Sequence, residues 1–93
     1  MKNIQIGFAI SEARKVRGIT AKDLAALSGL STTALSKIEG GTQSLSFASG
    51  IAIAKALGIT ANDLVDRIES VTSKVLEVEV QRKMDNIRKQ FSI

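Results

Sequence analysis

The chain has 93 residues, a net charge of +4, and 44% hydrophobic and 24% charged residues, which is typical of one small globular domain. It contains no Cys and no His, which excludes disulfides, thiol chemistry and zinc sites built on those ligands, and removes the commonest general base. No stretch resembles a glycine-rich phosphate loop, a signal peptide or a membrane span, so we expect a cytoplasmic, non-enzymatic protein without a metal or cofactor.

The first predicted helix runs from about Ile4 to Arg17 and ends at Gly18. Four of its apolar residues recur near helical spacing: Ile6, Ile10, Ala13 and Val16. Thr20 is a typical N-cap residue for a second helix over Ala21–Leu27, and Gly29 breaks the chain after it. These signals predict two short helices joined by a tight connection.

A third helix is predicted over Thr32–Glu39, with Ser31 as its N-cap and Gly40 at its end. Leu35 and Ile38 lie three residues apart and are expected to face the interior. The other face carries short polar groups and one cation: Thr32, Thr33, Ser36 and Lys37. A solvated surface has a similar composition, but such groups near a helix N-terminus also suit the major groove of DNA.

A fourth helix is predicted between Ser46, its cap, and Gly58, with Ile51, Ala54 and Leu57 as its apolar set. Thr60 then caps a fifth helix over Ala61 to about Arg67. Five short helices with short connections predict an all-α domain over residues 1–67.

Residues 68–93 have a different pattern, without Gly or Pro. Two apolar stripes lie on nearly opposite faces of a hypothetical helix. The first contains Leu64, Ile68, Val71, Val75 and Val78, and the second contains Leu76, Val80, Met84, Ile87 and Phe91. Residues Val75–Val80 also fit a strand, and that alternative stays open beside the helix. Since one small domain cannot easily cover two opposite faces, we expect a C-terminal dimerisation extension rather than packing onto the same domain.

The segment from Ala21 to Gly40 has the residue types that a helix-turn-helix requires. Ala25 is small where the two helices back onto each other, and Gly29 suits a left-handed turn. The chain resembles the phage-repressor-type (Cro/cI, XRE) helix-turn-helix family over IGFAISEARKVRGITAKDLAALSGLSTTALSKIEGG and LSFASGIAIAKALGITANDL. This resemblance covers about residues 6–64. It implies a five-helix, lambda-repressor-like fold and an ion pair between Arg14 and Glu39.

The resemblance also implies that the third helix reads base edges, which assigns DNA-facing positions to Thr32, Thr33, Ser36 and Lys37. The chain departs from the family at Ala21, where a phosphate-binding Gln is common, and Lys22 is the candidate substitute. The loop after the third helix, often basic in the family, contains Thr42 and Gln43, which are candidate uncharged phosphate contacts. Residues 1–66 hold seven cations and five acids, a net charge of only +2, which favours binding as a dimer.

These observations lead to one main hypothesis and two alternatives. The main hypothesis is a transcriptional repressor that binds a palindromic operator in double-stranded DNA as a homodimer. One alternative is an autoregulating antitoxin or controller protein whose C-terminal segment binds a partner protein. The other is a protein-binding adaptor that does not read DNA. Single-stranded nucleic acid is a poor match, because the only aromatic residues are three Phe.

Overall fold

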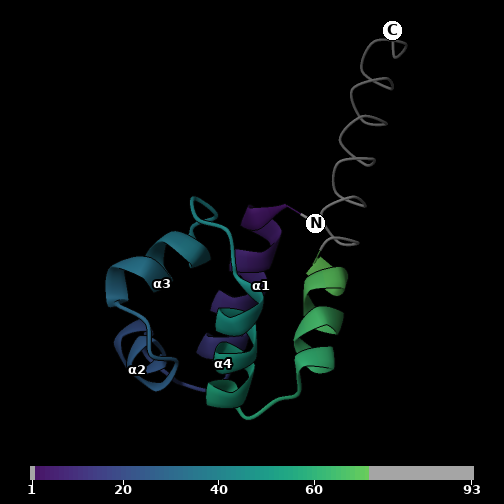
Figure 1. The fold of residues 1–93 in the computed structure, drawn as a ribbon. Coiled ribbons are helices and arrows are strands. Elements are labelled where there is room, and N and C mark those ends of the chain that lie inside the picture. The colour runs from purple at the N-terminus through teal and green to yellow at the C-terminus, as the bar shows by residue number, and fades with distance from the viewer. Residues whose placement is uncertain (1, 72–93) are drawn as a thin grey trace, which may run out of the picture.

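The computed structural model describes residues 2–71, and all of its regular structure is helical. Four helices are α1 (Asn3–Val16), α2 (Ala21–Leu27), α3 (Thr32–Glu39) and α4 (Phe47–Leu57). A fifth helix occupies residues 61–71. In Figure 1, α2 and α3 form one side of the molecule, and the fifth helix stands on the opposite side. The predicted all-α, five-helix fold is therefore confirmed.

Local hydrogen bonds fix where the helices begin. Four predicted cap residues accept a backbone N–H from the residue three positions ahead, at 3.0–3.1 Å, through their side-chain hydroxyls: Thr20, Ser31, Ser46 and Thr60. Each such bond satisfies a donor that the first turn of a helix leaves without an internal partner. The four predicted caps are thus confirmed, and each helix after α1 starts where the sequence indicates.

The start of the fifth helix has a reciprocal cap. Thr60 accepts the N–H of Asp63, and Asp63 Oδ2 accepts the N–H of Thr60 at 3.1 Å. The backbone N–H of Thr60 holds the pKa of the Asp63 carboxyl below its ordinary value, and the Thr60 hydroxyl and Arg67 act in the same direction. This start is therefore stabilised by an ionised carboxylate.

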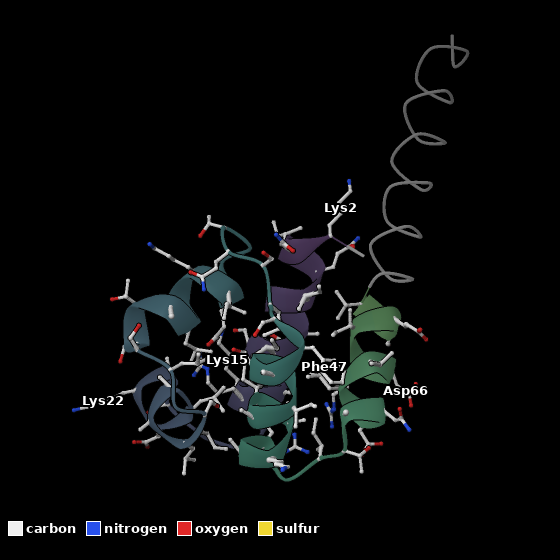
Figure 2. The ribbon with its side chains drawn as sticks, in the orientation of Figure 1. Lys2, Lys15, Lys22, Phe47 and Asp66 are labelled. Atoms are coloured by element: carbon white, nitrogen blue, oxygen red, sulfur yellow. The ribbon has the colours of Figure 1, made fainter. Side chains whose placement is uncertain are left out.

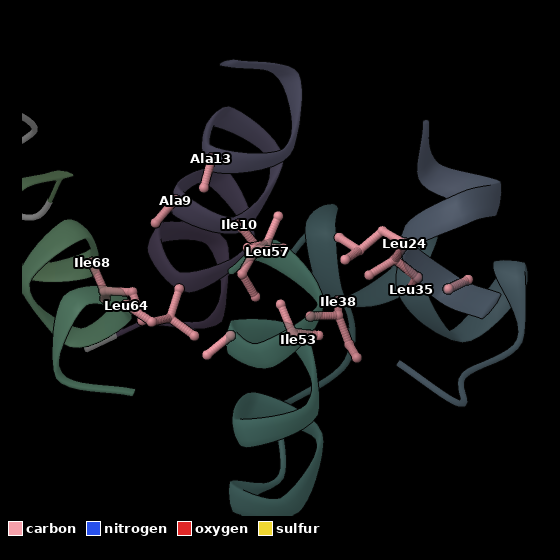
Figure 3. Packing of buried hydrophobic residues seen from close by; sticks show 12 residues of the cluster. Ala9, Ile10, Ala13, Leu24, Leu35, Ile38, Ile53, Leu57, Leu64 and Ile68 are labelled. Atoms are coloured by element: carbon pink, nitrogen blue, oxygen red, sulfur yellow. The ribbon is translucent and has the colours of Figure 1, made fainter. Parts of the chain in front are cut away.

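The core is built almost entirely from aliphatic side chains of all five helices (Figure 3). Its buried members are Ala9, Ile10, Ala13, Leu24, Ala25, Leu35, Ile38, Ile53, Ala54, Leu57, Leu64 and Ile68. The largest fully buried side chains are Ile10, Leu24, Leu35 and Ile53. Full burial of one such side chain contributes about 1.5–3 kcal/mol, so these four anchor the domain.

Two predicted inward residues are not in the core. Val16 is 76% exposed, because the inward line of α1 continues from Ala13 to the half-buried Arg17. In α4 the fully buried residue is Ile53, whereas Ile51 is only half-buried. Ile51 lies about 200° around the helix from Ile53 but only about 60° from the buried Ala54, so it lies at the edge of the buried face. The predictions for Val16 and Ile51 were therefore wrong, whereas Ile10, Ala13, Ala54 and Leu57 of the same predicted sets are buried.

The fifth helix continues beyond the predicted end at Arg67. Leu64 and Ile68 are 4% and 5% exposed, and Figure 3 shows them beside Ala9 and Ala13 of α1. All four residues belong to one buried cluster, so Ile68 is part of the core of the domain. The Val75–Val80 segment and most of the expected dimerisation extension lie outside the described residues. Between residues 2 and 71, no helix has the length and apolar character that a membrane crossing requires.

Candidate nucleic-acid interface

The turn between α2 and α3 is closed by backbone hydrogen bonds. Gly29 has a φ of 69°, and the N–H of Leu30 donates to the carbonyl of Ala25 at 2.9 Å. Open space surrounds the position where a Cβ of Gly29 would lie, so the backbone conformation alone favours glycine there. Ala25 is 1% exposed, as expected for a small residue where α2 meets α3. The predicted helix-turn-helix unit is present.

The two faces of α3 are sharply different. Leu35 and Ile38 are buried, at 0% and 2% exposure, so they fix α3 to the rest of the domain. The four predicted DNA-facing residues are all exposed: Thr32, Thr33, Ser36 and Lys37. Within residues 2–71, none of their side chains makes a hydrogen bond or an ion pair. This face therefore presents three hydroxyls and an ammonium group that are available to a ligand.

The loop after α3 is tied to the end of that helix. The carbonyl of Lys37 accepts the backbone N–H of Thr42 at 2.9 Å and that of Gln43 at 3.3 Å. The Thr42 hydroxyl also donates to this carbonyl at 3.3 Å, so its lone pairs rather than its proton remain free. Both side chains are exposed. The structure thus brings Thr42 and Gln43 next to the end of α3, as a continuous polar surface would require.

Lys22 lies in the first turn of α2 and is exposed. In Figure 2 its side chain points away from the molecule on the side formed by α2 and α3. Its ammonium group is therefore free to meet a polyanion approaching α3, which is the role that the sequence predicts for it. Lys15 of α1, labelled in the same view, is exposed and was not predicted to contribute.

The predicted ion pair between α1 and α3 is present. Arg14 Nη2 lies 3.0 Å from Glu39 Oε1, and Arg14 Nε lies 3.2 Å from both carboxylate oxygens. Arg14 Nη1 donates to the carbonyl of Ile19 at 3.0 Å. The side chains of Arg14 and Glu39 are only 15% and 11% exposed. The pair is therefore partly buried, and it joins the last residue of the candidate recognition helix to α1.

Gly7 was not predicted to have any role, although it lies in the contact between α1 and α3. It is buried, and a Cβ at this position would lie 2.2 Å from the carbonyl oxygen of Ile38. The sequence contains one signal for it, since an isolated glycine inside a helical pattern often marks close packing. The partner of that packing is the backbone at the end of α3, far away in sequence.

Comparisons with known proteins agree with this geometry. Residues 10–64 match the family described as Helix-turn-helix. The restriction-modification controller protein C.AhdI from Aeromonas hydrophila is 29% identical, with a TM-score of 0.65 over 67% of this chain and 94% of that one. The restriction-modification controller protein C.Esp1396I is 28% identical, with a TM-score of 0.72 over 77% and 94% of the two chains.

The clp gene regulator ClgR from Corynebacterium glutamicum has the same fold, with a TM-score of 0.79 over 89% of each chain at 24% identity. No match was found among curated protein sequences. The family match covers more than half of the chain and includes α2, the turn and α3. The chain therefore belongs to the XRE-type helix-turn-helix family and is a DNA-binding transcriptional regulator.

Proposed function

We propose that the chain is a sequence-specific repressor that binds a palindromic operator as a homodimer, with α3 in the major groove. The observation that supports this most directly is the exposed face of α3, whose four polar side chains have no partner within residues 2–71. Thr32, Thr33 and Lys37 would reach base edges, and Ser36 lies on the same face. Binding to the operator would by itself be enough to repress transcription, without a catalytic step.

The proposed phosphate contacts lie on either side of that face. Lys22 contributes a cation from α2, and the Gln43 side-chain amide contributes an N–H donor from the loop after α3. The Thr42 hydroxyl would have to leave the carbonyl of Lys37 before it could donate to a phosphate. Each protomer would bring two lysines to the interface, Lys22 and Lys37, so the electrostatic attraction between a single domain and DNA is weak. A dimer doubles these contacts and spans two half-sites roughly 34 Å apart, which is why we propose two-fold binding. The second copy would be held through the residues that follow Val71.

A controller protein is the second candidate function. It is favoured by the similarity to C.AhdI and C.Esp1396I, both of which are restriction-modification controller proteins. Such a chain would use the same DNA-reading face, and it would differ from a simple repressor in the genes that it regulates. The position of its operator relative to neighbouring genes distinguishes the two.

The direct test is binding of the full chain to the duplex that it selects from a randomised library. We expect it to bind that duplex about 10³-fold or more tightly than a duplex of scrambled sequence. The slope of log K against log salt should be about −2, because Lys22 of each protomer in a dimer neutralises one phosphate. A slope of about −1 would indicate a monomer. Equal affinity for both duplexes would overturn the proposed sequence-specific operator binding.

A further inference from the structure

The backbones of α1 and α3 touch at Gly7. A Cβ there would lie 2.2 Å from the carbonyl oxygen of Ile38, 2.5 Å from the carbonyl oxygen of Glu39 and 2.7 Å from the Glu39 carbonyl carbon. All three atoms belong to the backbone of the last turn of α3, so no side-chain rotation can relieve the overlap. A Cβ would move the end of α3 by about 1 Å or more before it reached ordinary contact.

A second glycine makes the same contact from the opposite direction. Gly41 follows α3 with a φ of 79°, and a Cβ there would lie 2.6 Å from the Cα of Ile4 and 2.9 Å from its backbone nitrogen. Ile4 and Gly7 are three residues apart and share one face of α1. Glycine on each side therefore lets the first turns of α1 lie directly against the end of α3, next to the start of the following loop (Figure 1).

This contact is separate from the packing that forms the helix-turn-helix unit itself. The unit is held by Leu24 of α2 and Leu35 of α3, which lie beside each other in the core (Figure 3), and by the turn at Gly29. A displaced α1 contact would leave these residues in place. It would change the tilt of α3 relative to the rest of the domain. In a dimer, the relative orientation of the two exposed α3 faces would change with it.

We infer that Gly7 is a positioning residue for DNA reading, which acts by setting how closely the last turn of α3 approaches α1. This inference rests on the proposed function. Groups that read bases must be held to about 0.5 Å, and the displacement expected from a single Cβ exceeds that tolerance. Gly41 has the same role from the α3 side of this contact, because its backbone lies directly against Ile4 of α1.

The test compares two glycine-to-alanine variants inside helices. Gly7→Ala introduces the overlap, whereas Gly50→Ala in α4 places its Cβ at an ordinary 3.4 Å from a Leu45 side-chain carbon. Both changes gain the same helix propensity. Under conditions where circular dichroism shows both variants fully folded, Gly50→Ala should bind the selected duplex as the wild type does. Gly7→Ala should bind it about tenfold or more weakly, since lost base contacts are worth at least that much.

The readout specific to positioning is the behaviour on scrambled duplex. Gly7→Ala should bind scrambled duplex with the wild-type affinity and salt slope, because its exposed lysines are unchanged. Equal loss on both duplexes, or no loss on either, would overturn the inference while leaving the proposed function intact. If the wild type itself failed to prefer the selected duplex, the proposed function would fall first.

A second pair of variants covers the case in which Gly7→Ala does not fold. Gly41→Asn and Gly58→Asn both place Asn, a residue that tolerates positive φ, at φ values of 79° and 73°. Only position 41 faces a backbone, since nothing lies within 4 Å of a Cβ at position 58. We expect Gly41→Asn to lose its preference for the selected duplex over scrambled duplex, and Gly58→Asn to keep it. If both Gly7→Ala and Gly41→Asn failed to fold while their controls folded, the contact would serve folding only and the inference would be wrong.

Discussion

Replacing Glu39 with Ala should destabilise the domain far more than replacing an exposed acid. The Glu39 carboxylate accepts three hydrogen bonds from Arg14 within 3.2 Å, and both side chains are almost nine-tenths shielded from solvent. The variant would leave the Arg14 guanidinium without a counter-ion in a site that water reaches poorly. The matched control is Glu12→Ala, because Glu12 is an exposed residue of α1.

The magnitude depends on burial and on the bonds that Arg14 retains. Removing one partner of a fully buried pair costs roughly 3–5 kcal/mol, and an exposed pair contributes about 0–1 kcal/mol. In the variant, Arg14 would still donate to the carbonyl of Ile19, and its side chain is 15% exposed to water. We therefore expect the free energy of unfolding to fall by about 2–3 kcal/mol. Glu39 is the last residue of α3, and a negative charge at a helix C-terminus is unfavourable. Removing it is favourable in that respect, so the measured loss of stability would be smaller than the contribution of the ion pair.

The assay is thermal and urea unfolding of the wild type, the two alanine variants and the double variant with Arg14→Met. For a domain of this size, 2–3 kcal/mol corresponds to a Tm lower by roughly 10–20 °C. Glu12→Ala should stay within about 0.5 kcal/mol of the wild type. The double-mutant cycle should give a coupling free energy comparable to the single loss. Equal melting temperatures for Glu39→Ala and Glu12→Ala would refute the reasoning.

Two further predictions concern the fifth helix and the C-terminal residues after it. Since the pKa of Asp63 is lowered from 3.8 in the folded state, its contribution to stability is present above that value and is lost as the pH falls below it. Asp63→Ala should thus have a lower Tm than the wild type at neutral pH, and the difference in Tm should shrink as the pH falls below 3.8. A Tm difference that stays constant with pH would contradict the stabilising role of this cap. A chain shortened to end at Val71, which keeps the buried Ile68, should remain helical by circular dichroism, sediment as a monomer and bind the selected duplex much more weakly. If it still dimerised at the concentration where the full chain does, the interface would lie elsewhere.

The starts of the helices could be predicted from the sequence because their causes are local. Thr20, Ser31, Ser46 and Thr60 each bond to a backbone group three residues away, so a short window of sequence contains the whole interaction. The division of α3 into a buried and an exposed face could also be predicted, since its apolar and polar residues separate cleanly at helical spacing.

The burial of Ile53 rather than Ile51 in α4 could not be predicted in the same way. Its sequence FASGIAIAKAL is apolar or small on nearly every side, so periodicity does not distinguish Ile51 from Ile53. Only the positions of neighbouring helices decide which of the two is buried. At the end of α1, Val16 was favoured by its apolar character, although the helical stripe passes through Arg17, whose guanidinium donates to the carbonyl of Ala13.

The candidate site also contains features that local sequence predicts and features that it does not. The exposed positions on α3 follow from its pattern, and the Arg14–Glu39 pair came from the resemblance to the family and is confirmed in the structure. The role of Gly7 could not be predicted from local reasoning, because a glycine inside a helix indicates a weak point or close packing without identifying the packing partner. Its meaning depends on Ile38 and Glu39, whose carbonyl groups approach only in the folded domain.

The most direct test of the central claim is the base preference of a variant in the exposed face of α3. Lys37→Ala and Thr33→Ala should each bind the selected duplex about 1–3 kcal/mol more weakly and lose discrimination at particular base pairs. The control is Lys55→Ala, which removes the same charge from an exposed position on α4. The account predicts unchanged base preference for the control and relaxed preference for both α3 variants. Unchanged affinity and unchanged preference in Lys37→Ala and Thr33→Ala would contradict the assignment of α3 as the recognition helix.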